Sequence, residues 1–123
     1  MGYDVHITRK RAWHDEDGEE ISLAEWLAVV EAGPAMRLDG HAEARLAGGA
    51  VLTVESEGLA VWTGWSGHGR SGGMAWFDCR GGMITVKNPD REILRKMWEL
   101  AQALSARVQG DEGELYGPSG DPM

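Results

Sequence analysis

The placement of glycine is the feature that most limits how this chain can fold. Glycine accounts for 18 of the 123 residues, about twice its usual share. Between residues 40 and 82, glycines separate short segments in which apolar and polar residues alternate. Glycine supplies the positive φ that tight turns need, and alternation with period two is typical of half-buried strands. The middle of the chain therefore predicts short strands joined by tight turns.

Six segments are predicted as strands, and a seventh, shorter one follows them. They are 3–9, 41–46, 50–55, 59–65, 74–80 and 83–87, with 107–109 as the short closing strand. The Gly81-Gly82 pair between two of these segments is a strong hairpin signal. Because connections this short join antiparallel neighbours, we expect most of the sheet to be a meander.

Two amphipathic helices are predicted on either side of the glycine-rich middle. Ser22 with Glu25 forms a capping box, and the Gly33-Pro34 pair ends the first helix. Asn88-Pro89 begins the second helix, with Asn88 as N-cap. Apolar residues recur at helical spacing in both, at Leu23, Trp26, Leu27 and Val30, and at Ile93, Met97, Leu100, Ala101 and Leu104.

This order of elements predicts a single α+β domain. We expect one antiparallel sheet of five to seven strands, mostly a meander, with the two helices on one face. A chain of this length is most simply one domain. The domain is expected over residues 1–116, followed by a flexible C-terminal tail over 117–123.

Strand alternation assigns the side chains to the two faces of the sheet. The face beneath the helices is predicted to take Val5, Ile7, Leu52, Val54, Val61, Phe77, Cys79, Ile84 and Val86. The opposite face is predicted to take Asp4, His6, Thr8, Thr53, Glu55, Trp62, Trp76, Asp78, Arg80, Thr85 and Lys87. This second face mixes charges with two indole rings, so either something covers it or it binds something.

The acidity of the chain is concentrated. The formal net charge is −8, and residues 15–20 hold five acids and no base. An acidic protein repels phosphates, so nucleic-acid binding is disfavoured, whereas a basic protein partner is favoured. The acids expected to steer such a partner are Asp15, Glu16, Asp17, Glu19 and Glu20. A solvated acidic loop without a partner is the alternative interpretation.

The glycine-rich segment 64–73 matches two catalytic patterns without the context that either needs. The dinucleotide fingerprint at residues 67–72 requires a helix to follow it, and here a strand is predicted. The nucleophile-elbow pattern at residues 69–73 also needs a strand-to-helix turn. Since Trp and Arg are typical interface anchors, this segment instead offers candidates for binding, namely Trp65, His68 and Arg70.

The other reactive side chains do not indicate a metal or a cofactor. The four histidines, at positions 6, 14, 41 and 68, show no short metal-ligand spacing. The lone Cys79 alternates into the predicted core. We therefore expect neither a metal nor a cofactor. His6, beside Asp4 on the exposed face, is the candidate general base if the chain is an enzyme.

The sequence also indicates where the protein resides. It contains no run near the ~20 apolar residues of a membrane-spanning helix. Residues 1–11 lack the apolar centre of a signal peptide, and a single cysteine forms no internal disulfide. We therefore expect a cytoplasmic protein that does not associate with membranes.

The two ends of the chain resemble those of a family of small, uncharacterised bacterial cytosolic proteins. The resemblance rests on YDVHITR at 3–9 with Trp13 after it, KNPD at 87–90, and VQGDEGE at 108–114. It covers most of the chain and implies no known activity, so it assigns no catalytic residue. In size, charge and lack of a catalytic motif, the chain is also loosely similar to immunity proteins of bacterial polymorphic toxins.

The sequence thus favours a non-enzymatic, cytosolic protein-binding module over an enzyme, and we expect a monomer or homodimer. An immunity protein that neutralises a basic bacterial toxin is the specific hypothesis. The alternative is a small-ligand-binding protein or small enzyme that uses the open sheet face and segment 64–73. Convergence of the candidate side chains on one concave pocket would favour this alternative. The candidate binding residues are His6, Trp62, Trp65, His68, Arg70, Trp76 and Asp78.

Overall fold

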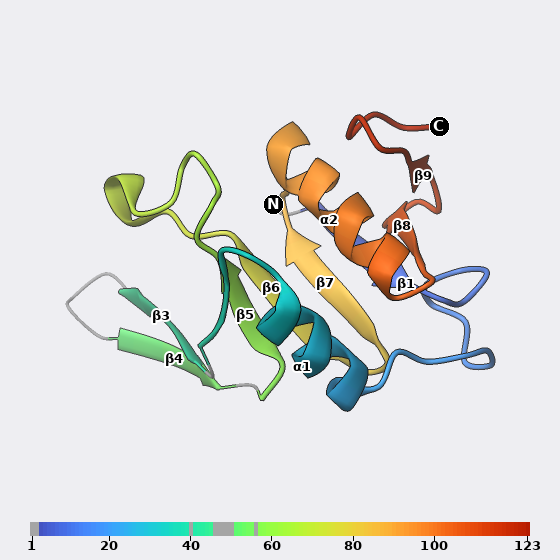
Figure 1. Ribbon diagram of the computed structural model, residues 1–123, viewed down its shortest axis with the longest axis horizontal. Coiled ribbons are helices and arrows are strands. Elements are labelled where there is room, and N and C mark those ends of the chain that lie inside the picture. Colours follow the sequence, from blue (N-terminus) through green and yellow to red (C-terminus); the bar gives the residue numbers. More distant parts are fainter. Residues whose placement is uncertain (1–2, 40, 46–50, 56) are drawn as a thin grey trace.

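The chain forms a seven-stranded antiparallel sheet with two helices, the α+β class that the sequence predicts. The computed structural model describes residues 3–39, 41–45, 51–55 and 57–123. Both helices lie on the same face of the sheet (Figure 1). The elements are β1 (Asp4–Thr8), α1 (Leu23–Ala32), β2 (Met36–Leu38), β3 (His41–Arg45), β4 (Val51–Glu55), β5 (Leu59–Trp62), a short 3-10 helix (Arg70–Gly72), β6 (Trp76–Arg80), β7 (Met83–Lys87), α2 (Arg91–Ala103), β8 (Arg107–Gly110) and β9 (Leu115–Tyr116). In the described part of the chain, neither helix is long and apolar enough to cross a membrane.

The first strand lies inside the sheet, between elements that come much later in the chain. The strand order is β2-β5-β6-β7-β1-β8-β9. Of the strands predicted to form the meander, β5 to β7 do so, and β1 joins them to the β8–β9 hairpin through antiparallel pairing on both sides. Strands β3 and β4 pair with each other in a separate two-stranded sheet. The facing predicted for residues 52–55 lies outside the described side chains.

The hairpin between β6 and β7 sets the register of the central sheet. Gly81-Gly82 has φ values of 64° and 82°, the two positive values that a type I′ turn requires. This turn places Cys79 opposite Ile84 and Asp78 opposite Thr85. Because residues paired across two strands point to the same side, the first pair faces the helices and the second faces away from them.

The first helix begins at the predicted capping box. The Ser22 hydroxyl accepts from the Glu25 N–H, and the Glu25 carboxylate accepts from the Ser22 N–H, both at 3.1 Å. Arg9 donates to the same carboxylate through two guanidinium nitrogens, at 3.0 and 2.5 Å. The bonds from Arg9, followed by those from Ser22, lower the pKa of Glu25 to about 2. The carboxylate therefore ties the start of α1 to the end of β1.

The second helix begins later than the sequence predicts. Its N-cap is Asp90, whose carboxylate accepts from the Ile93 N–H at 2.8 Å. Asn88 has a φ of 48°, and its side-chain oxygen accepts from the Tyr3 N–H at 2.8 Å. The prediction of Asn88 as N-cap is therefore wrong. Asp caps helices as well as Asn does, and Asn88 instead bonds to the residue that precedes β1.

The core lies between the two helices and one face of the sheet. Trp26 and Phe77 are fully buried, with ring centroids 6.4 Å apart. The Trp26 indole donates to the Gly58 carbonyl at 2.8 Å. Glycine is required there because an added Cβ would lie 2.5 Å from the Cys79 carbonyl oxygen. Six predicted core residues belong to this core, namely Val5, Ile7, Phe77, Cys79, Ile84 and Val86.

The predicted facing of β5 is wrong. Trp62 packs against the core on the helix face, where the Lys96 ammonium lies 5.7 Å from the centroid of its ring. Val61 is paired with Trp76 and lies on the opposite face, outside the core cluster. All four residues of β5 are apolar, so alternation contains no information on which of them face the core.

Residues 117–123 fold back onto the domain, where the sequence predicts a tail. The Met123 N–H donates to the Leu115 carbonyl at 2.7 Å. Asp121 pairs with Arg91 of α2 at 2.6 Å. The segment is therefore attached both to β9 and to the start of α2.

We expect Trp26→Ala to lower the free energy of unfolding by about 3–5 kcal/mol, because it removes a fully buried ring. Trp26→Phe keeps most of the apolar volume but leaves the Gly58 carbonyl without its donor, and should cost about 1–3 kcal/mol. Urea unfolding followed by circular dichroism measures both. Leu38→Ala, at a side chain that is 44% exposed, is the control and should change stability by less than about 0.5 kcal/mol. Equal losses in all three variants would contradict the assignment of Trp26 to the core.

Candidate functional site

The sheet face opposite the helices is covered over one half and open over the other. The segment after β1 crosses β1 and β8, where Trp13 contacts His6 and Gln109. Over β5, β6 and β7, the same face is hollowed by a cavity. The two halves meet at β7, which contributes side chains to both.

Trp13 closes the covered half. Its ring stacks on His6, with centroids 4.2 Å apart and planes inclined by 18°. Its backbone N–H donates to the Gln109 side-chain oxygen at 2.6 Å, and its indole N–H donates to the Asp111 carbonyl at 3.3 Å. His6 and Gln109 are consequently only 4% exposed. The expected exposed histidine is therefore buried.

Beneath Trp13, His6 connects two other side chains. Its Nε2 lies 2.9 Å from Asp111 Oδ1, and its Nδ1 lies 2.9 Å from Thr85 Oγ1. Burial alone would raise the pKa of Asp111, but hydrogen bonds from His6 and from the Asp4 N–H lower it below its usual value. An ionised Asp111 requires a donor at Nε2. In neutral His6, Nδ1 therefore accepts from the Thr85 hydroxyl.

The Thr85–His6–Asp111 row has the residue types of a catalytic triad but the opposite orientation of the imidazole. In the Ser-His-Asp triad, Nε2 faces the nucleophile and Nδ1 faces the acid. Here Nδ1 faces Thr85 and Nε2 faces Asp111. Trp13 covers His6. The partner of His6 is Asp111 and not Asp4, so the pairing predicted from the sequence is wrong, as is the expected exposure of this histidine.

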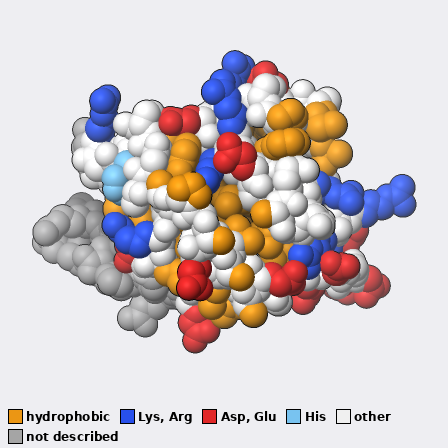
Figure 2. Space-filling model, in the orientation of Figure 1, with side chains coloured by type: hydrophobic (Ala, Val, Ile, Leu, Met, Phe, Trp, Pro, Cys, Tyr) orange, Lys and Arg blue, Asp and Glu red, His pale blue; other side chains and the backbone are white. Residues whose placement is uncertain are grey.

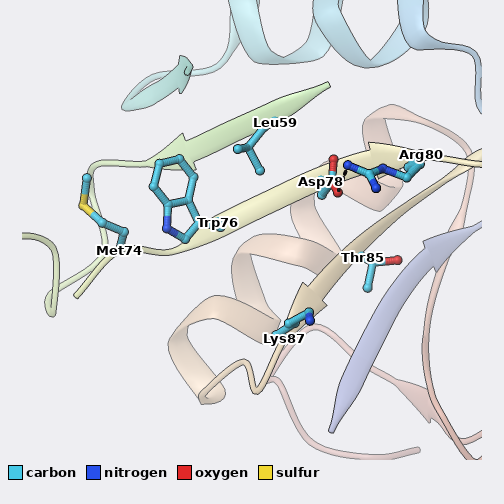
Figure 3. A pocket seen from close by; sticks show the side chains of 7 residues that line it. All are labelled: Leu59, Met74, Trp76, Asp78, Arg80, Thr85 and Lys87. Atoms are coloured by element: carbon cyan, nitrogen blue, oxygen red, sulfur yellow. Dashed lines mark ion pairs between the residues drawn. The ribbon is translucent and has the colours of Figure 1, made fainter. Parts of the chain in front are cut away.

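The open half holds a cavity of about 410 Å³, which we call the sheet pocket. Figure 3 shows it on the face of the sheet that points away from α2. Strands β5, β6 and β7 and the residues before β6 supply its lining, which is Leu59, Met74, Trp76, Asp78, Arg80, Thr85 and Lys87.

The sheet pocket combines apolar and charged side chains. Trp76 is half-buried, and Leu59 beside it is 4% exposed. The Arg80 guanidinium lies 3.4 Å from the Asp78 carboxylate, and Figure 3 marks this ion pair with a dashed line. Lys87 is exposed at the end of β7 and makes no ion pair with any described residue. An apolar floor with cationic groups around it is suited to binding.

The structure does not bring the predicted binding residues together. Trp76 and Asp78 line the sheet pocket, but His6 lies under Trp13 and Trp62 lies on the helix face. The other three, Trp65, His68 and Arg70, belong to the glycine-rich segment and do not line it. These residues therefore do not converge on one pocket, which is the arrangement that would favour a small-ligand-binding protein or a small enzyme.

The pocket also contains residues that the sequence did not single out as a site. Strand alternation predicts the correct face for Arg80, Thr85 and Lys87. Their shared face with Trp76 is the signal that could group these residues into one site. The sequence does not place Leu59 on this face, because the alternation predicted for β5 assigns its residues to the wrong faces. Met74 precedes β6, where no alternation applies.

The glycine-rich segment packs against the start of α2. The Trp65 indole donates to Asp90 Oδ2 at 2.9 Å, and the Ser66 hydroxyl donates to Glu92 at 2.6 Å. A Cβ at Gly67 would lie 2.7 Å from the Trp65 ring, so glycine lets this ring pack closely. Trp65 therefore has a structural role. Arg70 is exposed within the short 3-10 helix.

The acidic segment 15–20 is partly used inside the molecule. Glu19 pairs with Arg9 at 3.1 Å, and Glu20 lies 3.7 Å from Lys10. These contacts offset part of the negative charge of the segment. The remaining exposed acids of the segment include Glu16 and Asp17.

The helix side of the molecule carries a second hollow, of about 370 Å³, between α1 and α2. Figure 2 looks onto this side and shows apolar side chains across its middle, with acidic and basic ones around them. Most of the lining is small and aliphatic, and its two charged residues, Lys96 and Glu99, lie 3.6 Å apart. The hollow therefore offers few of the polar contacts that orient a ligand.

Two further observations concern reactive groups. The described residues include no cluster of three or more His, Cys, Asp or Glu side chains that could hold a metal ion. Cys79 is buried, and this burial raises its pKa to about 11. Its thiol therefore stays protonated at neutral pH, which makes it a poor nucleophile.

Comparison with known proteins adds no further constraint. No protein-family profile, curated protein or solved structure matches this chain. The resemblance of its two ends to small bacterial cytosolic proteins stays a prediction.

We expect Asp111→Asn to destabilise the fold at neutral pH by about 1 kcal/mol, a low value for a charged hydrogen bond because the Asp111 side chain is 35% exposed. The pKa of Asp111 is lower in the folded than in the unfolded state. Its carboxylate therefore stabilises the fold above the ordinary Asp pKa near 4, and this contribution is lost as the pH falls through the lower, folded value. The gap between wild type and variant should shrink between pH 5 and the most acidic pH at which the protein stays folded.

Urea unfolding at a series of pH values measures this gap. Glu16→Gln removes an equal charge from an exposed loop and is the matched control, for which we expect a small and nearly constant gap. A gap for Asp111→Asn that stays constant down to acid pH would contradict the role given to the His6–Asp111 bond.

Proposed function

We propose that this chain is a non-enzymatic binding protein and that the open half of the sheet face is its recognition surface. The sheet pocket carries this proposal. It presents a half-buried indole, Trp76, with Leu59 and Met74 beside it and charged groups around them. An apolar centre with Trp and a charged rim is the usual make-up of a binding surface.

The placement of reactive groups favours binding over catalysis. His6 is covered by Trp13, and its Nδ1 engages the Thr85 hydroxyl. Cys79 faces the helices and has a raised pKa. Within the sheet pocket, the acid Asp78 is paired with a guanidinium. Of the described pocket residues, only the Thr85 hydroxyl is bonded to a base, His6, and the ring of that base is covered by Trp13, so the pocket offers one hydroxyl and no exposed base for a reaction.

We further propose that the partner is a basic protein, and in the specific form of this proposal the chain is a cytoplasmic immunity protein against a basic bacterial toxin. The support is the acidic segment 15–20, in which Glu16 and Asp17 are exposed. Such charges raise the rate of encounter with a basic surface when salt is low. Trp76 would then provide the short-range contact.

A second candidate is a protein that binds a small ligand in the sheet pocket. One observation favours it, since about 410 Å³ lies within the usual range for small-molecule sites. The enzymatic form of this candidate is weaker, because the glycine-rich segment is bonded to α2 at Asp90 and Glu92 and does not line the pocket.

We expect Trp76→Ala to weaken binding to the partner by roughly 30-fold or more, as for a central interface Trp. The natural candidate partner is the protein encoded next to this chain, and titration calorimetry with the purified pair measures the affinity. Leu38→Ala removes an exposed apolar side chain outside the sheet pocket, so it is the control and should leave the affinity unchanged. Replacing Glu16 and Asp17 by Gln and Asn should slow association at low salt and have little effect at high salt.

Three outcomes would count against this proposal. Failure of the pair to associate even at low salt would remove the protein partner. Equal affinity of wild type and Trp76→Ala would remove the open half of the sheet face as the interface. A dimer of the chain alone in light scattering, abolished by Trp76→Ala, would instead assign this surface to self-association.

A further inference from the structure

We propose that the sheet pocket binds a low-molecular-weight organic anion that carries a flat apolar ring. This inference rests on the second candidate function, ligand binding in the sheet pocket, and specifies the chemistry of the ligand. Three properties of the lining support it, namely its charge, its indole surface and the direction of its hydrogen-bond donors.

The ionised groups of the pocket lining carry a surplus of positive charge. Arg80 and Lys87 are its cations, and Asp78 is its acid. The Asp78 carboxylate lies 3.4 Å from the Arg80 guanidinium, whereas Lys87 has no ion pair within the described chain. Asp4 stands opposite Lys87 in the sheet but does not line the pocket. In a chain of net charge −8, this local surplus favours a ligand of opposite sign.

The indole of Trp76 provides the surface for a flat ring. Figure 3 shows it lying beside Leu59, with Met74 farther along the same side of the pocket. Leu59 is 4% exposed and forms part of the floor. Aromatic rings pack on an indole in offset or edge-on arrangements, which adds to the gain from apolar burial. The cavity, at about 410 Å³, has room for a molecule of one or two rings.

The hydrogen-bond network under Trp13 decides which groups can donate to the ligand. The Asp111 carboxylate accepts from His6 Nε2, so in neutral His6 the Nδ1 atom accepts a hydrogen bond from the Thr85 hydroxyl. Thr85 therefore offers the pocket an acceptor and no donor. The donors left for an anion are the Lys87 ammonium, the Arg80 guanidinium and the Trp76 indole N–H, which has no partner within the described chain.

These properties together disfavour two simpler ligands. A neutral flat ring would use Trp76 but leave the surplus charge of Lys87 uncompensated. A small inorganic anion would meet the cations but leave the apolar floor exposed to water. A carboxylate attached to an aromatic ring meets both requirements, and indole-3-acetate is a probe of this class.

The test compares indole-3-acetate with its neutral amide, indole-3-acetamide, which has the same ring and no charge. Each is titrated into the ¹⁵N-labelled full chain, and the indole N–H resonance of Trp76, identified by its absence in Trp76→Phe, reports binding in the pocket. We expect indole-3-acetate to shift this resonance and the backbone amides of β5 to β7. The amide should bind at least about threefold more weakly.

The variant Lys87→Gln should weaken the binding of indole-3-acetate by about two- to fivefold, as expected for one exposed charge, and leave indole-3-acetamide unaffected. Arg107→Gln, on β8 outside the pocket lining, removes an equal charge from an exposed position and should leave both ligands unaffected. If both variants weaken the binding of indole-3-acetate equally, the effect comes from the overall charge of the protein and not from Lys87, and the inference is overturned.

The outcomes also separate this inference from the function on which it rests. Equal binding of both ligands at Trp76 would retain the sheet pocket as a ligand site but overturn its preference for anions. Shifts confined to residues away from β5 to β7, or no shifts with either ligand, would overturn the inference that the pocket takes a flat ring with an acidic group, and the second candidate function would then need a ligand of another chemical class. Neither result depends on the existence of a protein partner.

Discussion

The stack of Trp13 on His6 is the contact on which the organisation of this molecule depends. It covers His6 on β1 and Gln109 on β8, which would otherwise face water. His6 is bonded to Asp111, and Gln109 is bonded to backbone groups, including the Trp13 N–H. A buried polar network is tolerated only when its members are satisfied, and Asp111 and Gln109 provide that satisfaction. Trp13 does not line the sheet pocket, which lies farther along the same face over β5, β6 and β7.

Local patterns in the sequence predicted those parts of the fold that local contacts determine. The Gly81-Gly82 turn and the capping box at Ser22 form between residues close in sequence, so their signals are complete in a few positions. The central place of β1 depends on its pairing with β7 and β8. Pairing between strands so far apart in the chain leaves no pattern in the sequence around β1. β5 is apolar throughout, so alternation does not show which of its residues face the helices. β2 has three residues and is too short for alternation to identify it as a strand.

The candidate site shows the same division. Alternation placed Trp76, Asp78, Arg80, Thr85 and Lys87 on one face of two adjacent strands, and the hairpin register brings them into one pocket. Alternation could not show that His6, on the same face, would be covered, because the covering Trp13 comes from a segment without regular structure. Nor could it show that Trp65 packs on Asp90 across a separation of 25 residues. Facing is therefore predictable from a strand pattern, whereas accessibility depends on the loops.

The charges of the molecule point to two kinds of contact at two places. The acidic segment 15–20 attracts a basic surface, but Arg9 and Lys10 offset part of its charge at short range. The sheet pocket holds Arg80 and Lys87, which repel a basic group and attract an anion. At physiological salt, exposed charges act over only about 8 Å, so the two regions act on different groups of any bound molecule. A basic partner attracted by the acidic segment would therefore contact the open half of the sheet face through apolar or acidic side chains, and a free organic anion would compete with it for that surface.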